Sequence, residues 1–121
     1  MVDIKSIIKD NISVKKEMLD VCTKDIQKAA EIMSQAIKCG KKIIWCGIGG
    51  SAADAQHMAA ELMGGLKDHD CLPISSIALT TDTSFITAWA NDTDYGSIFS
   101  LQIMGLGNAG DILIAISTNC N

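Results

Sequence analysis

The stretch that decides the fold is IIWCGIGGSAADAQHMAAELMG, residues 43–64. Its apolar start, 43–46, is too short for a buried helix and is bounded by lysines and glycine, which is typical of a buried strand. Residues 47–51, G-I-G-G-S, predict a tight loop, and an alanine-rich helix is expected over about 52–63, ended by Gly64. A strand, a glycine loop and a helix in this order indicate an α/β unit.

The same alternation continues along the chain. We expect further strands at 74–79 and 112–116, and helical segments at about 85–90 and 95–106. Strands that alternate with helices form parallel sheets with right-handed crossovers. The sequence therefore predicts a doubly wound α/β architecture in which helices cover both faces of a parallel sheet.

The N-terminal segment has a different pattern. Its apolar residues recur at helical spacing among lysines and acids, first up to about residue 20 and then from a second helix that Thr23 is expected to cap, until Gly40 stops it. We expect one domain over 1–121, made of a helical hairpin at about 2–40 and an α/β part at about 41–121.

Composition excludes several classes of protein. The chain has 121 residues, 48% of them apolar and 20% charged, which favours a packed globule over disorder. Its net charge of −4 argues against nucleic-acid binding. We find no apolar run long enough for a membrane span and no secretion signal, so we expect a cytoplasmic protein. Five cysteines without a C-x-x-C pattern indicate neither a disulfide framework nor a zinc knuckle.

The glycine loop is the first candidate binding feature. Residues 47–52 fit G-x-G-x-x-A, the dinucleotide fingerprint. That fingerprint needs an acid that closes the next strand, about 20 residues on, whereas the first acid after the next strand is Asp82, about 30 residues on. Glycines at a helix N-terminus also let backbone N–H groups approach other anions. The alternative is a turn that only packs a strand against a helix.

His57 and Glu61 lie four residues apart on the helix that this loop opens, so they share one helical face. Helical side chains lean toward the N-terminus, which points both toward the strand ends where ligands bind in parallel sheets. An imidazole and a carboxylate so placed can share a divalent metal, or the carboxylate can act as a general base. The alternative is an ordinary surface pair.

Two polar runs follow other elements. Ser117, Thr118 and Asn119 come directly after the last strand, where hydroxyls and backbone amides suit a phosphate monoester, or form a polar turn. Asn91 and Asp92 can hydrogen-bond sugar hydroxyls, or start a helix as a cap.

Several blocks together resemble a known family: CGIGGSAADAQHMAAEL (46–62), LPISSIALTTDTS (72–84), NDTDYGSIF (91–99) and GDILIAIST (110–118). They are similar to the phosphoheptose isomerases of the SIS (sugar isomerase) domain family. The resemblance implies a three-layer, flavodoxin-like parallel sheet and a homotetramer with sites at subunit interfaces. It also implies isomerisation of D-sedoheptulose 7-phosphate to D-glycero-D-manno-heptose 7-phosphate, a step toward ADP-heptose for lipopolysaccharide or capsule.

The resemblance also implies roles for individual residues. His57 and Glu61 would bind one zinc ion per site, and Glu61 would also transfer protons. Substrate contacts would fall on the glycine loop and on both polar runs, namely Ile48, Gly49, Gly50, Ser51, Glu61, Asn91, Asp92, Ser117, Thr118 and Asn119.

The sequence departs from the family pattern at several positions. Ile48 replaces a usual Asn, Asp94 a Gly, Asn119 a hydroxyl and Cys120 a turn glycine. The C-terminal part of the family fold, with the Gln and His that complete the zinc site, is expected to be absent, and His69 is a poor substitute for them.

Two non-catalytic interpretations remain alongside the isomerase. One is an SIS protein that binds a replication initiator, whose relatives lack the glutamate four residues after the histidine. The other is a sugar-phosphate sensor that uses the same pocket without turnover. The presence of Glu61 favours the isomerase over the first.

Overall fold

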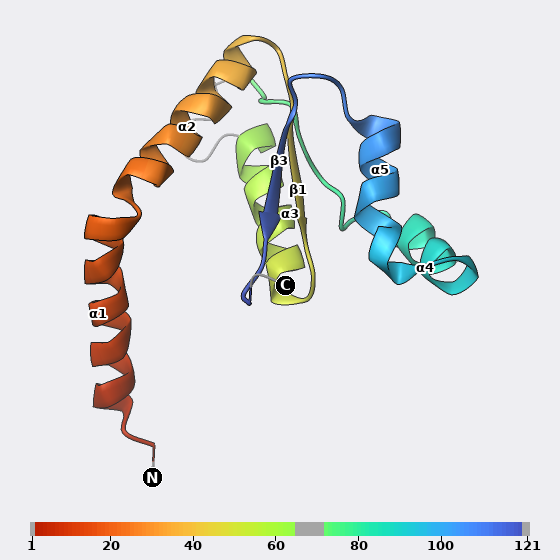
Figure 1. The fold of residues 1–121 in the computed structure, drawn as a ribbon. Coiled ribbons are helices and arrows are strands. Elements are labelled where there is room, and N and C mark those ends of the chain that lie inside the picture. Colours follow the sequence, from red (N-terminus) through yellow and green to blue (C-terminus); the bar gives the residue numbers. More distant parts are fainter. Residues whose placement is uncertain (1, 65–71, 120–121) are drawn as a thin grey trace. The chain divides into compact units, whose positions relative to one another are not determined.

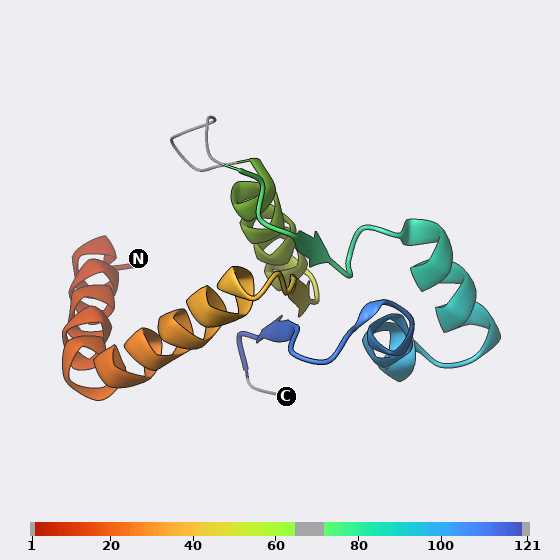
Figure 2. The same cartoon turned by 90° about the horizontal axis from the view of Figure 1, so that it is seen from above.

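A computed structural model describes residues 2–64 and 72–119 of the chain (Figures 1 and 2). The chain divides into two compact units, Met1–Ser34 and Gln35–Asn121. His69 and Cys120, which the sequence singled out, lie outside the described residues.

The first unit consists of helix α1, Ile4–Val21, and most of helix α2, Thr23–Lys38. The carboxylate of Asp3 caps α1, with its Oδ1 accepting from the Lys5 amide at 3.0 Å. Thr23 is the first residue of α2, and its hydroxyl donates to the Leu19 carbonyl at 2.6 Å. The hydroxyl of Thr23 is therefore bonded to the last turn of α1. The prediction that Thr23 caps α2 is wrong, because Thr23 is already the first residue of that helix.

The second unit contains a parallel sheet, as predicted, and its strand order is β2-β1-β3. The strands are β1 (Ile43–Gly47), β2 (Ser76–Ala78) and β3 (Ile112–Ile116). β2 is shorter than expected because the Ile74 amide donates to the Leu62 carbonyl of a helix, at 3.1 Å, and not to β1.

Helix α3 (Gly50–Gly64) follows the glycine loop, and α4 (Thr83–Asp92) follows β2. The helix expected at 95–106 is split into a 3-10 turn, η1 (Tyr95–Ser97), and α5 (Ile98–Leu106). α3 and α5 lie on opposite sides of the sheet (Figure 1), which gives the predicted three layers.

The core surrounds β1, in which every residue is buried. Alternate residues of a strand face opposite sides of a sheet. Ile44 and Cys46 form a cluster with Leu79, against which Phe99 and Ile103 of α5 pack. The central strand is therefore fixed by apolar packing.

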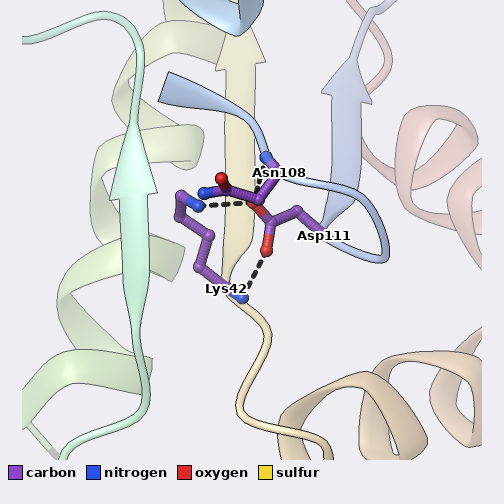
Figure 3. A network of polar contacts seen from close by, with 3 residues as sticks. All are labelled: Lys42, Asn108 and Asp111. Atoms are coloured by element: carbon purple, nitrogen blue, oxygen red, sulfur yellow. Dashed lines mark hydrogen bonds and ion pairs between the residues drawn. The ribbon is translucent and has the colours of Figure 1, made fainter. Parts of the chain in front are cut away.

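The N-terminal ends of β1 and β3 are joined by a polar network (Figure 3). The Asp111 carboxylate accepts from the Lys42 amide at 3.0 Å, from the Lys42 ammonium, and from the Asn108 amide at 2.8 Å. These bonds hold the pKa of Asp111 down at about 2, with the Lys42 side-chain bond as the main cause. The network fixes the strand ends opposite those that the sequence predicts to bind ligand.

Candidate functional site

The loop between β1 and α3 depends on glycine at two positions. A Cβ atom on Gly47 would lie 2.6 Å from the carbonyl oxygen of Ser51 and 2.9 Å from its Cβ. Gly49 has φ +64°, a conformation that side-chain-bearing residues rarely adopt. The chain can therefore turn sharply from the strand and bring the first turn of α3 against the end of β1.

A pocket of about 480 Å³ opens at this end of the sheet. Its walls come from the ends of β1 and β3, the first turn of α3, and α5. It is lined by Cys46, Gly47, Ile48, Ser51, Phe99, Ala115, Ile116, Ser117, Thr118 and Asn119. The carboxyl edge of a parallel sheet is where ligands of α/β proteins bind.

Hydroxyl groups line one part of the pocket. Ser51 is buried, with 5% of its surface exposed, in the first turn of α3, and Ser117 Oγ donates to Asn119 Oδ1 at 3.1 Å. The first amides of a helix have no partner within the helix, and the helix dipole favours negative charge there. This corner of the pocket is chemically suited to an oxyanion such as phosphate.

Apolar side chains line the rest. Phe99 comes from α5, Ala115 and Ile116 from β3, and Cys46 from β1. Burial raises the pKa of the Cys46 thiol, which forms part of the pocket wall.

The structure brings His57 and Glu61 together on one face of α3, with Nε2 and Oε1 3.9 Å apart. The His57 side chain is 72% exposed and that of Glu61 27%. Neither residue lines the pocket, in which Ser51 is the lining residue from α3. His57 lies six positions after Ser51 in α3, which is about 9 Å along the helix axis.

Asn91 and Asp92 are the last two residues of α4, exposed, and linked by a bond of 2.7 Å from Asn91 Nδ2 to Asp92 Oδ1. They do not line the pocket. They also do not start a helix, because α4 begins at Thr83 and is capped by the carboxylate of Asp82. Gly49 and Gly50 belong to the loop without lining the pocket.

A zinc ion needs three or four protein ligands in an ordinary site. Within 2–64 and 72–119, no group of three or more His, Cys, Asp or Glu side chains could hold a metal ion. His57 and Glu61 are donors of the right chemistry, but they do not complete a zinc site by themselves.

Some pocket residues were not predicted from the sequence. Ile116 precedes the polar run 117–119, so the strand-end argument could have identified it. Phe99 lies on a helix far along the chain, and only the packing of α5 on the sheet brings it to the pocket. No local pattern marks such a residue.

The profile of the SIS domain matches residues 8–121. The chain belongs to the SIS domain family. It is 50% identical over 118 residues to a phosphoheptose isomerase of Shewanella denitrificans and 49% identical to one of Shewanella sp. strain ANA-3, covering 98% of this chain in each case. The predicted resemblance is thereby confirmed.

Solved structures agree with this family assignment. A phosphoheptose isomerase of Neisseria gonorrhoeae superposes with a TM-score of 0.86 at 42% identity, and one of Francisella tularensis with 0.90 at 35%, each over 95% of this chain. This chain covers 59% and 60% of those two chains, and 60% and 59% of the two Shewanella relatives. The structure thus contains part of the SIS fold.

Among the described helices, none has the length and apolarity that a membrane crossing requires.

Proposed function

We propose that this chain provides the substrate pocket and the acid–base residue of a phosphoheptose isomerase. The reaction would convert D-sedoheptulose 7-phosphate to D-glycero-D-manno-heptose 7-phosphate. The observation that carries the proposal is the hydroxyl-lined pocket at the carboxyl edge of the sheet, in a chain about 50% identical to proteins of that name.

The phosphate would bind in the hydroxyl corner. Ser51, Ser117 and Thr118 offer hydroxyls there, and the first amides of α3 add N–H donors. Asn119 lines the same corner, and the Ile48, Gly49 and Gly50 backbone adds contacts. Binding the phosphate far from the reacting carbons would position the sugar and lower the entropic cost of reaction.

The proton transfer would depend on Glu61. Ketose–aldose isomerisation moves a proton between C1 and C2 through an enediol, and a positioned carboxylate can take and return it. Glu61 lies on the same helix as Ser51, ten positions further along α3. His57 is the polar neighbour of Glu61, 3.9 Å away, and would help orient the reacting end.

Zinc enters the proposal as a cofactor for which His57 and Glu61 would supply two ligands. The remaining ligands would come from residues outside those described here. When bound, the metal would stabilise negative charge on the substrate oxygens.

We further propose a cytoplasmic homo-oligomer, a tetramer, acting in ADP-heptose precursor synthesis without nucleic acid or membrane. Large apolar side chains exposed in the first unit support association between copies, among them Ile4, Ile8, Ile12, Leu19 and Ile26. The exposed Asn91 and Asp92 would then contact substrate at a subunit interface.

The two alternatives are a sugar-phosphate sensor and a non-catalytic binder of a replication initiator. The separation of the His57–Glu61 pair from the pocket, within one chain, favours the sensor as the second candidate. A sensor would bind the sugar phosphate without converting it.

The test uses a fusion of this chain to the part of the Shewanella denitrificans relative that the match does not cover. With zinc and sedoheptulose 7-phosphate, we expect aldose formation, and a loss of about 100-fold or more in Glu61→Gln, since general-base catalysis is worth about 10²–10⁴. Asp54→Asn, an exposed substitution on the same helix, should keep the activity. A thermal shift with sugar phosphate but no product would indicate the sensor, and near-normal turnover in Glu61→Gln would refute the role of Glu61.

A further inference from the structure

The side chain of Ile48 has an unusual position in the pocket. It belongs to the β1–α3 loop, lines the pocket, and is 61% exposed. Its neighbours Gly47, Gly49 and Gly50 carry no side chains, so Ile48 provides the only side chain of the loop before Ser51. The loop backbone is fixed by the close approach of Gly47 to Ser51 and by the left-handed Gly49. Ile48 is therefore a branched apolar group held on a constrained loop at the pocket surface.

The pocket lining contains two kinds of side chain. Ser51, Ser117 and Thr118 supply hydroxyls, whereas Phe99 and Ile116 supply apolar surface. Ile48 is also apolar and, at 61%, is more exposed than Phe99 and Ile116, which are partly buried. An oxyanion alone would gain hydrogen bonds from the hydroxyls and nothing from the apolar side chains. A ligand that uses both kinds of side chain must carry an anionic group and a carbon chain with C–H surface.

We propose that Ile48 is a specificity-determining residue that packs against the C–H side of the carbon chain of a phosphate monoester. This inference rests on the proposed phosphate site and deepens it. Isoleucine cannot hydrogen-bond, so a ligand hydroxyl held against it would lose its water without gaining a partner. The pocket should therefore prefer monoesters that present C–H groups on this side, and it should bind them more tightly than inorganic phosphate.

The size of the effect follows from the exposed surface. Covering about 50 Å² of apolar surface on such a side chain corresponds to about tenfold in affinity. Removing that surface should therefore cost a carbon-bearing ligand about tenfold and leave inorganic phosphate unaffected.

The experiment measures dissociation constants of inorganic phosphate and of n-butyl phosphate by NMR titration of the intact chain. The wild type should bind butyl phosphate about tenfold more tightly than phosphate, and Ile48→Asn should reduce this ratio to about twofold or less at unchanged phosphate affinity. Leu72→Asn, a substitution at an exposed apolar position outside the pocket lining, should keep the wild-type ratio.

The result that overturns the inference is an unchanged ratio in Ile48→Asn. Ser117→Ala separates this failure from failure of the phosphate site. If Ser117→Ala weakens phosphate while Ile48→Asn keeps the ratio, the phosphate site stands and the role of Ile48 falls. If the wild type shows no phosphate binding at these residues, both fall.

Discussion

The substitution Gly47→Ala tests how the loop holds α3 against the sheet. A Cβ atom at this position would lie 2.6 Å from the Ser51 carbonyl oxygen, 2.7 Å from its carbonyl carbon and 2.9 Å from its Cβ. The first two are backbone atoms of α3, so the clash is relieved only if the helix moves away from β1. Overpacking of this kind typically costs about 1–3 kcal/mol.

The matched control is Gly50→Ala in the same loop. Gly50 is the first residue of α3, its added Cβ meets no atom within 4 Å, and its φ lies outside the left-handed region. This variant should therefore be about as stable as the wild type. The two alanine variants should differ by about 1–3 kcal/mol in the free energy of unfolding.

Urea unfolding followed by tryptophan fluorescence measures this difference, because Trp45 is 4% exposed in β1 two residues before Gly47. Gly47→Ala should also weaken phosphate binding, since the shift displaces Ser51. Equal midpoints and slopes for the two variants would refute the argument that the close approach requires glycine.

Two further predictions concern stability. The pKa of Asp111 is lowered from 3.8 to about 2, so its contacts stabilise the fold above pH 4, and this contribution is lost as the pH falls through about 2. In Asp111→Asn, the melting temperature should therefore fall less between pH 4 and pH 2 than in the wild type. An equal fall in the two proteins would contradict the network. Leu79, 1% exposed, should cost about 2–5 kcal/mol when replaced by Ala, measured by urea unfolding. Leu113→Ala, at a 46% exposed position, should cost clearly less, and equal losses would argue against the core as described.

Much of the fold could be predicted because local patterns determine it. The apolar run 43–46 and the glycine loop after it identify β1 and the start of α3, and strand–helix alternation predicts the parallel sheet. The length of β2 could not be predicted, because the Ile74 amide donates its hydrogen bond to the Leu62 carbonyl of α3, a tertiary contact. The role of Thr23 could not be predicted either, because its hydroxyl donates to the Leu19 carbonyl of the preceding helix.

The candidate site divides in the same way. Ser51 and residues 117–119 could be placed together because the carboxyl ends of parallel strands meet at one edge. The pairing of His57 with Glu61 follows from helical spacing. The sequence argument did not account for the distance of this pair from the pocket. A helical side chain leans toward the helix N-terminus, but this lean is much shorter than the rise of two helical turns. Phe99 required the tertiary structure.

The most direct test of the account is solvent exchange of the carbon-bound proton. The fusion described above is incubated with zinc and sedoheptulose 7-phosphate in D₂O, and deuterium at C1 and C2 is followed by NMR. The account predicts deuterium incorporation by the unsubstituted protein and at least about 100-fold slower incorporation by Glu61→Gln, with phosphate binding retained. Incorporation by Glu61→Gln at the rate of the unsubstituted protein would contradict the central claim that this carboxylate moves the proton.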